Sequence, residues 1–340
     1  MKGKILCFGE LLLRLSPSPD GSWLQDNTLP VYIGGAEANV AAALAKWETP
    51  VKYYTALPDH YLTKNILHQL QHSSIDVSAV QLSGKRIGLY FLQQGSDLKN
   101  AEVIYDREFS AFSQLQTGTI DWDEILRDVC WFHFSAISPA ISENAAAVCR
   151  EALLAATRKN IPVSVDLNYR AKLWQYGKQP VEIMATLLPY CSLVMGNIWS
   201  AAILLGLPLF QELLEKNSRE AYLQHSLETS RLILGQYPSC QQIANTFRFD
   251  EGSRGIRYFA TLFGEGILEQ SPQFQTPEIA DKVGSGDCFM AGLLYGRYHN
   301  LPNREVLNFA AAAAFGKFQE KSDATSQTVA QIRTILKRYE

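Results

Sequence analysis

The stretch Asp281-Lys-Val-Gly-Ser-Gly-Asp-Cys-Phe-Met-Ala-Gly292 predicts a tight glycine turn that leads directly into an apolar helix. Gly284 and Gly286 can adopt backbone angles that a side chain forbids, and they let another group approach the main chain closely. The helix is expected to begin at about Gly286, and the N–H groups of its first turn have no partner within the helix. Together with the positive end of the helix dipole, these N–H groups favour an anion such as phosphate.

Asp287 lies at the start of the same expected helix. A carboxylate is poorly suited to holding phosphate, so its presence suggests a base placed beside a phosphate site. The alternative is that Asp287 only caps the helix. The turn alone does not decide between the two, because short glycine motifs often occur by chance.

The composition excludes several classes of protein. Of 340 residues, 47% are hydrophobic, which is ordinary for a globular chain. The net charge of −3 argues against a nucleic-acid binder, and no apolar run approaches the length of a membrane span. The apolar stretch near the N-terminus is too short for a signal peptide. The six cysteines form no C-x-x-C pair, so we expect free thiols and a cytoplasmic protein.

The order of the expected elements predicts an α/β fold. From about residue 129 onwards apolar strands alternate with helices, which indicates a mainly parallel sheet covered on both faces. In such sheets ligands bind beyond the carboxyl ends of the strands. Residues 87–93 and 101–109 differ, since they are two strand-like runs joined by a glycine-containing turn. This hairpin predicts a small sheet that stands off the main body.

Two groups of polar residues are candidates for a binding site. Tyr105 and Arg107 share one face of the second hairpin strand, where they could bind the hydroxyls and the carboxylate of a sugar acid. Asp166, Asn168 and Arg170 follow an apolar strand and share a face if that strand stays extended. Polar groups there are costly unless they line a site. The alternatives are an exposed hairpin of mixed residues and a structural salt bridge at a strand end.

Three segments resemble the ribokinase-like (PfkB) sugar kinases. G-S-G-D at residues 284–287 resembles the G-A-G-D turn that supplies the anion hole and the catalytic aspartate of that family. G-G-A-E-A-N at 34–39 and D-L-N-Y-R-x-x-L-W at 166–174 are most like the 2-keto-3-deoxygluconate kinases. The resemblance covers residues 9–323. It implies one ribokinase-like kinase domain over residues 1–340, with three layers, a mainly parallel central sheet, and a small β lid from about residues 11–33 and 85–112.

The resemblance also implies an activity and the residues that perform it. We expect ATP-dependent phosphorylation of a sugar acid, 2-keto-3-deoxygluconate above others, to its 6-phosphate with Mg²⁺. Asp287 would be the general base, and the amides of Gly284, Ser285 and Gly286 would face the transferring phosphoryl group and the nucleotide. The expected substrate-binding residues are Gly34, Gly35, Asn39, Tyr90, Tyr105, Arg107, Arg170, Asp287 and Asp323. Further nucleotide contacts are expected from Asn168, Asn197, Thr246 and Arg248.

The sequence departs from the family pattern at three places. Ser200 replaces the glutamate of N-x-x-E that helps to hold magnesium, so the ion would be held by phosphates and water. Ser322 replaces the usual glycine before Asp323, and the lysine and glycines that normally follow Arg248 are missing. His68 and His72 have metal-ligand spacing, but no third ligand is evident, and we predict no protein metal site.

Other functions remain open at this point. The chain could be a kinase of a neutral sugar such as fructose or ribose, or a sugar-binding regulatory protein without catalysis. A nicotinamide-dependent enzyme is disfavoured, because no G-x-G-x-x-G follows the first strand. The sequence does not separate ketodeoxygluconate from ketodeoxygalactonate. Lid hairpins of this family commonly pair, which implies a homodimer or a higher homo-oligomer, and no nucleic-acid or membrane partner is expected.

Overall fold

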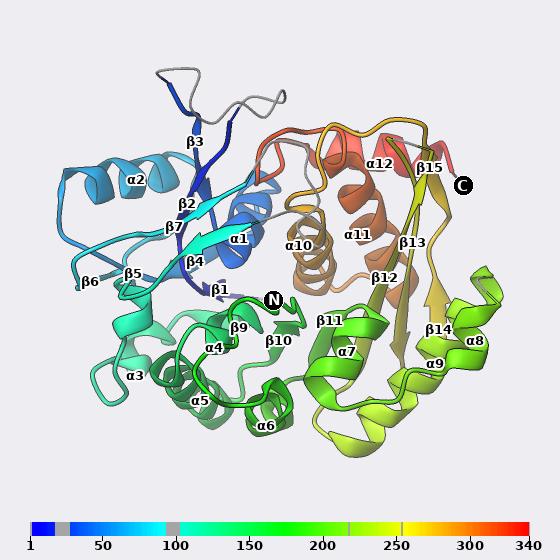
Figure 1. The fold of residues 1–340 in the computed structure, drawn as a ribbon, viewed down its shortest axis with the longest axis horizontal. Coiled ribbons are helices and arrows are strands. Elements are labelled where there is room, and N and C mark those ends of the chain that lie inside the picture. Colours follow the sequence, from blue (N-terminus) through cyan, green and yellow to red (C-terminus); the bar gives the residue numbers. More distant parts are fainter. Residues whose placement is uncertain (1, 18–27, 93–102, 217, 253, 340) are drawn as a thin grey trace.

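The computed structural model describes residues 2–339 apart from 18–27, 93–102, 217 and 253. Within these residues, a nine-stranded sheet forms the centre of the molecule, in the order β14-β13-β12-β11-β10-β9-β1-β4 with β15 beside β13 (Figure 1). The six strands from β4 to β12 are parallel, and β13, β14 and β15 add antiparallel pairs at one edge. The strands are β1 Lys4–Phe8, β4 Val51–Tyr54, β9 Val129–Ser135, β10 Val163–Asp166, β11 Leu193–Gly196, β12 Gln242–Glu251, β13 Gly255–Gly264, β14 Ile267–Gln270 and β15 Phe274–Thr276.

Helices cover both faces of this sheet, as predicted. Strand β1 shows why, because Ile5 and Cys7 belong to one apolar core while Leu6 and Phe8 belong to the other. The first core contains residues of α1 Ala36–Lys46, α2 Tyr61–His72, α10 Ser285–Tyr298, α11 Asn303–Lys317 and α12 Val329–Lys337. The second contains residues of α3 Trp122–Ile125, α4 Ile137–Ala140, α5 Glu143–Arg158, α6 Pro180–Leu187, α7 Ile198–Leu205 and α9 Arg219–Gln236, and α8 Gln211–Glu215 precedes α9.

A second, four-stranded sheet in the order β3-β2-β7-β8 contains the expected hairpin strands. These are β2 Leu12–Leu15, β3 Val31–Gly34, β7 Gly88–Phe91 and β8 Ile104–Asp106. The β7 and β8 strands pair antiparallel, as predicted, but both are shorter than the runs 87–93 and 101–109. The predicted turn between them lies in residues 93–102, outside the described part. We call this four-stranded sheet the upper sheet. A short parallel pair, β5 Ala56–Leu57 with β6 Gln81–Leu82, was not predicted.

Two other expectations concern the whole chain. All six cysteines are free thiols, five of them buried. In the part of the chain that the structure describes, no helix combines the length and the apolar character needed to cross a bilayer.

Helices α10 and α11 pack closely because their contact surface is made of very small residues. The interior of α11 is a run of five alanines, residues 310–314, that are fully buried. Gly292 of α10 faces this run so closely that an added Cβ would lie 2.5 Å from Ala310 Cα. The packing matters for function, since α10 carries the turn described below at its N-terminus.

We therefore predict that Gly292→Ala destabilises the fold, although alanine favours helix, because the new methyl group overpacks the α10–α11 contact. The expected loss is about 1–3 kcal/mol in the free energy of unfolding, measured by denaturant titration. Gly235→Ala is the matched control, since this helical glycine of α9 has open space around it. The control should be neutral or stabilising by up to about 1 kcal/mol. Equal effects of the two substitutions would contradict the packing argument.

Candidate active site

A cavity of about 720 Å³ opens at the carboxyl ends of the parallel strands and is lined by residues of both sheets. Glu10 reaches it after β1, Asp166 ends β10, and Gly196 ends β11. The upper sheet contributes Tyr90 and Tyr105. This is the position that the parallel topology predicts for a ligand. The predicted site residues in its lining are Gly35, Asn39, Tyr90, Tyr105, Arg107, Asn168, Arg170, Asn197, Thr246, Arg248, Gly284, Ser285, Gly286 and Asp287.

The glycine turn before α10 has the geometry of an anion site. Gly284 is the N-cap with φ 75°, a left-handed conformation, and a Cβ there would collide with the main-chain oxygen of Asp323. Helix α10 begins at Ser285, one residue earlier than predicted, and the Cys288 N–H donates to the Gly284 carbonyl at 2.8 Å. By helix geometry, the N–H groups of residues 285–287 therefore have no acceptor inside the helix. Gly286 has open space where a side chain would stand.

Asp287 is the third residue of α10 and does not cap it, so the capping alternative is wrong. Its Oδ2 accepts a hydrogen bond of 2.7 Å from Nδ2 of Asn39, which lies on α1. The carboxyl group is buried, and burial raises the pKa of Asp287 to about 7, while the bond from Asn39 lowers it and the charge of Glu37 raises it. A carboxylate with this pKa can accept a proton near neutral pH.

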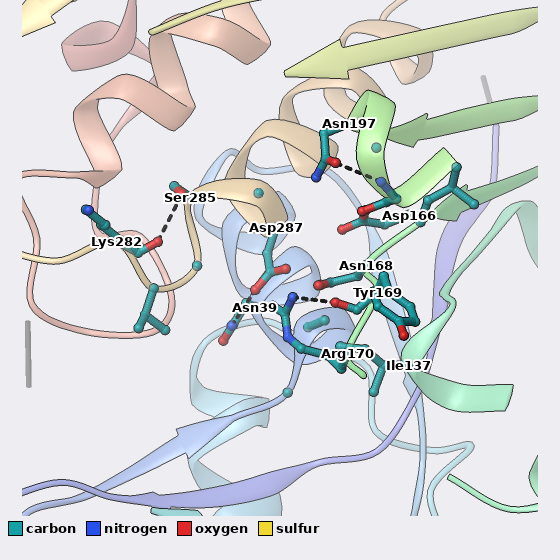
Figure 2. A pocket seen from close by; sticks show the side chains of 18 of the residues that line it. Asn39, Ile137, Asp166, Asn168, Tyr169, Arg170, Asn197, Lys282, Ser285 and Asp287 are labelled. Atoms are coloured by element: carbon teal, nitrogen blue, oxygen red, sulfur yellow. Dashed lines mark hydrogen bonds between the residues drawn. The ribbon is translucent and has the colours of Figure 1, made fainter. Parts of the chain in front are cut away.

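Figure 2 shows Asp287, Asn168 and Arg170 around the same space. Strand β10 ends at Asp166 and does not stay extended, yet Asp166, Asn168 and Arg170 all line the cavity. The Nη1 of Arg170 donates to the carbonyl of Tyr169 at 3.1 Å. Among the described residues no carboxylate pairs with Arg170, so the structure does not show the strand-end salt bridge that was the alternative. Burial, and then the charge of Asp287, raise the pKa of Asp166.

Arg107 is not an isolated cation, because it forms a buried ion pair with Glu10. Its Nε and Nη2 lie 2.7 and 2.6 Å from the same oxygen, Oε2 of Glu10. Both side chains are buried and both residues line the cavity. Sequence reasoning missed Glu10, although its place directly after the first strand was a signal that it could reach the site.

Two predicted substrate-binding residues are found behind the cavity and not in its lining. Asp323 is 2% exposed, and its Oδ2 accepts a 2.6 Å hydrogen bond from the hydroxyl of Tyr90. A Cβ on Gly34 would lie 2.9 Å from the same oxygen. Tyr90 therefore stands between Asp323 and the cavity. Arg14, which was also missed, pairs with Asp323 Oδ1 at 2.6 Å.

The far end of the cavity contains the predicted nucleotide residues. Asn197 is the N-cap of α7, and its side chain accepts from the N–H of Ser200 at 2.9 Å. Thr246 and Arg248 lie on β12, which continues to Glu251 and pairs with β13, so the segment after Arg248 is strand. Trp199 and Ile203 also line this end and were not predicted.

The described residues contain no cluster of three or more His, Cys, Asp or Glu side chains that could hold a metal ion. The rings of His68 and His72 are 4.7 Å apart on α2, without a third ligand of this kind. The cavity lining also contains side-chain oxygen atoms of Asp166, Asn168 and Ser200. Side-chain oxygens suit Mg²⁺, which keeps several water and phosphate ligands.

Comparison with known proteins identifies relatives over the full length of the chain. A 2-dehydro-3-deoxygalactonokinase of Haloferax volcanii is 26% identical over 341 aligned residues, covering 99% of this chain and 98% of that protein. The crystal structure of a 2-dehydro-3-deoxygluconokinase of Thermotoga maritima superposes with a TM-score of 0.89 at 30% identity, covering 98% and 99% of the two chains. A fructokinase of Xylella fastidiosa with bound ATP shares the fold at 19% identity, with a TM-score of 0.73 and 99% of each chain covered.

The profile of the pfkB family carbohydrate kinases matches residues 2–329, which is nearly the whole chain. This match agrees with the glycine turn, the helix N-terminus and the buried carboxyl group found at residues 284–287. It also excludes the nicotinamide-dependent alternative. With a match over this length, the chain belongs to the pfkB family of carbohydrate kinases.

Proposed function

We propose that this carbohydrate kinase transfers the γ-phosphoryl group of ATP to the primary hydroxyl of a 2-keto-3-deoxy sugar acid of the gluconate or galactonate type. The observation that carries the proposal is Asp287, a buried carboxylate with a pKa of about 7 beside the free N–H groups of α10. Two guanidinium groups in the same cavity, Arg107 and Arg170, could bind an acid. The names of the galactonate and gluconate kinase relatives support this substrate class.

Asp287 takes the proton of the attacking hydroxyl in this mechanism. The sugar oxygen forms a bond to the γ-phosphorus, the bond from that phosphorus to the bridging β,γ-oxygen breaks, and ADP leaves. The main-chain N–H groups of Ser285 and Gly286 face the charge that spreads over the transferring group. Since phosphoryl transfer depends mainly on positioning and electrostatics, one base and one anion site are sufficient protein groups to catalyse it.

The lining also fits the nucleotide and its metal. The open space at Gly286 and the free N–H groups suit phosphate oxygens, and Thr246, Arg248 and Asn197 extend the polar lining away from the sugar end. Mg²⁺ would neutralise charge on the phosphates when bound. Asp166, Asn168 and Asn197 are the residues whose oxygens could hold it directly or through water, since Ser200 offers only a hydroxyl.

The upper sheet would act as a lid over the sugar. It supplies Tyr90 and Tyr105 to the cavity, while Val31 and Ile104 remain 56% and 59% exposed on its strands. These two residues lie on the edge strands β3 and β8, and edge strands present unpaired backbone groups that can pair with another chain. We therefore infer a homo-oligomer formed through the upper sheet. The free cysteines suit the reducing cytoplasm, where we place the protein.

One observation favours a second candidate, a kinase of a neutral sugar. The Arg107–Glu10 pair is neutral as a unit, so Arg107 does not offer a full uncompensated charge. Within the described residues Arg170 forms no ion pair of this kind, although it interacts electrostatically with Asp166 and Asp287, and its charge favours an acid. A binding protein without catalysis is supported only by Ser200 and is opposed by the environment of Asp287.

The first prediction concerns the base. Asp287→Asn keeps the size of the side chain and its contact with Asn39 but cannot accept a proton. We expect turnover with a sugar acid to fall at least 10²-fold, by about 10²–10⁴, while ATP affinity changes little. Steady-state kinetics and calorimetric titration with ATP measure both. Near-normal turnover of this variant would remove Asp287 from the mechanism.

The second prediction concerns pH. Because Asp287 must be ionised to act, turnover should rise with pH through about 7 and then level off. The free energy of unfolding changes with pH in the opposite direction. Because the pKa of Asp287 in the folded protein lies above its ordinary value, protonated Asp287 stabilises the fold, and this contribution is lost as pH rises towards the folded pKa. Asp287→Asn should therefore raise Tm relative to wild type more at about pH 8.5 than at about pH 5.5. A pH-independent difference would show that the carboxyl is not desolvated.

The third prediction concerns the acid. Arg107→Ala should raise KM for the sugar acid far more than KM for a neutral sugar, because a lost buried charge contact costs about 2–5 kcal/mol. The double variant Arg107→Ala with Glu10→Gln removes the unpaired carboxylate that the single variant leaves behind. If it shows the same selective loss, Arg107 itself binds the acid. Equal losses for both sugars would mean that the carboxylate lies elsewhere.

A further inference from the structure

Arg14 is one of the largest side chains that the structure buries completely, at 0% exposure. It lies on β2 of the upper sheet, and its guanidinium group reaches out of that sheet towards the turn before α10. There Nη2 pairs with Asp323 Oδ1 at 2.6 Å and donates to the carbonyl of Lys321 at 3.3 Å. Nη1 lies 3.8 Å from Asp281 Oδ2, and the group stacks over the ring of Tyr32 at 4.4 Å.

The two carboxylates that face Arg14 hold opposite sides of the active site. Asp323 accepts from the hydroxyl of Tyr90 on the sugar side, and its main-chain oxygen packs against Gly284 on the phosphate side. Asp281 Oδ1 accepts from the N–H of Val283 at 3.0 Å, which fixes the turn itself. One guanidinium group therefore contacts both the support of the sugar-binding tyrosine and the support of the anion site.

A role in stability alone explains this arrangement poorly. Within the described part of the chain, Nε and Nη1 of Arg14 have no hydrogen-bond partner. A buried ion pair must overcome the cost of removing both charges from water, and apolar residues of similar volume often serve stability as well or better. A second buried cation, Lys317, donates to the Glu320 carbonyl at 3.2 Å and helps to balance the charge of Asp281 and Asp323. The fixed geometry of Arg14 is what an apolar residue could not supply.

We propose that Arg14 is a positioning residue that holds the sugar-binding upper sheet in register with the phosphate-binding turn of α10. It touches neither substrate. It acts through Asp323 and Tyr90 on one side and through Asp281 and Val283 on the other. The inference rests on the proposed kinase reaction, but it does not depend on which carbohydrate is the acceptor.

Misalignment has a characteristic kinetic result. If the two half-sites shift relative to each other, each still binds its own substrate, but the sugar oxygen no longer approaches the γ-phosphorus in line. A shift of about 1 Å can cost about 10²-fold in rate. Water can then attack instead: its oxygen bonds to the γ-phosphorus, one of its protons passes to Asp287, and the bond to the bridging oxygen breaks. ADP and inorganic phosphate then form without sugar phosphate.

The test compares Arg14→Gln with Arg86→Gln. Arg86 pairs with Asp106 Oδ2 at 2.7 Å, so the control breaks an ion pair to a strand of the same upper sheet without touching the turn. Release of ADP and formation of sugar phosphate are measured in parallel, with whichever sugar the wild type phosphorylates. For Arg14→Gln we expect kcat to fall about 10²-fold, KM for both substrates to stay within about threefold, and more than one ADP per sugar phosphate. Arg86→Gln should keep wild-type values and a ratio of one.

Asp281→Asn is the second variant, in case Arg14→Gln does not fold. The asparagine oxygen can still accept from Val283 N–H, but the charge facing Arg14 is lost. We expect the same signature with a smaller fall in kcat, about tenfold, since this contact is the longer one. Tight coupling of ADP to sugar phosphate in every folded variant would overturn the proposal, as would a loss confined to KM for the sugar. If the wild type accepts only neutral sugars, the substrate assignment fails while this comparison remains valid.

Discussion

The proposed mechanism depends on keeping a carboxylate out of water at a helix end that attracts negative charge. Asp287 is buried, and Asn39 of α1 supplies its hydrogen bond. Burial raises its pKa to about 7, so the group is half ionised near neutral pH and can accept a proton there. The same environment costs stability when Asp287 is charged. The alanine-rich contact between α10 and α11 packs the helix that carries both Asp287 and the free N–H groups closely against the core.

The sugar end of the cavity is built on a separate sheet, and glycines make the junction between the two parts possible. Gly284 and Gly34 each leave room for Asp323, one for its main chain and the other for its carboxylate. Because a Cβ at either position would push Asp323 away, the two glycine motifs that stand 250 residues apart in the sequence serve one contact. The direct substrate contact that the resemblance implied for Asp323 stays a prediction. In the structure, Asp323 lies outside the cavity lining and accepts the hydrogen bond of Tyr90. It supports Tyr90 from behind and closes the gap between the sheets.

The sequence was sufficient to predict the strand–helix alternation, the hairpin strands and fourteen of the residues that line the cavity, because these depend on local patterns. Polar residues at strand ends and glycines before helices carry such signals, as at Asp166 and Gly284. The partners of buried charged residues carry no such local signal in the sequence. Glu10 pairs with Arg107 across 97 residues, and Arg14 pairs with Asp323 across 309. No spacing rule connects such positions, so the ion pairs that determine the charge of the site became visible only in three dimensions.

These ion pairs change how charge selectivity in the cavity is explained. Counting residues gives two arginines for one acid, but Glu10 neutralises Arg107, and Asp166, Glu37 and Asp287 add carboxyl groups to the lining. Burial raises the pKa of all three carboxyl groups. The sugar acid that we propose as substrate would therefore meet the paired guanidinium group of Arg107 and that of Arg170, for which no ion pair is found among the described residues. For the proposed acid substrate, selectivity then depends on how far the guanidinium groups of Arg107 and Arg170 offset the carboxyl groups around them, and not on the number of arginines alone.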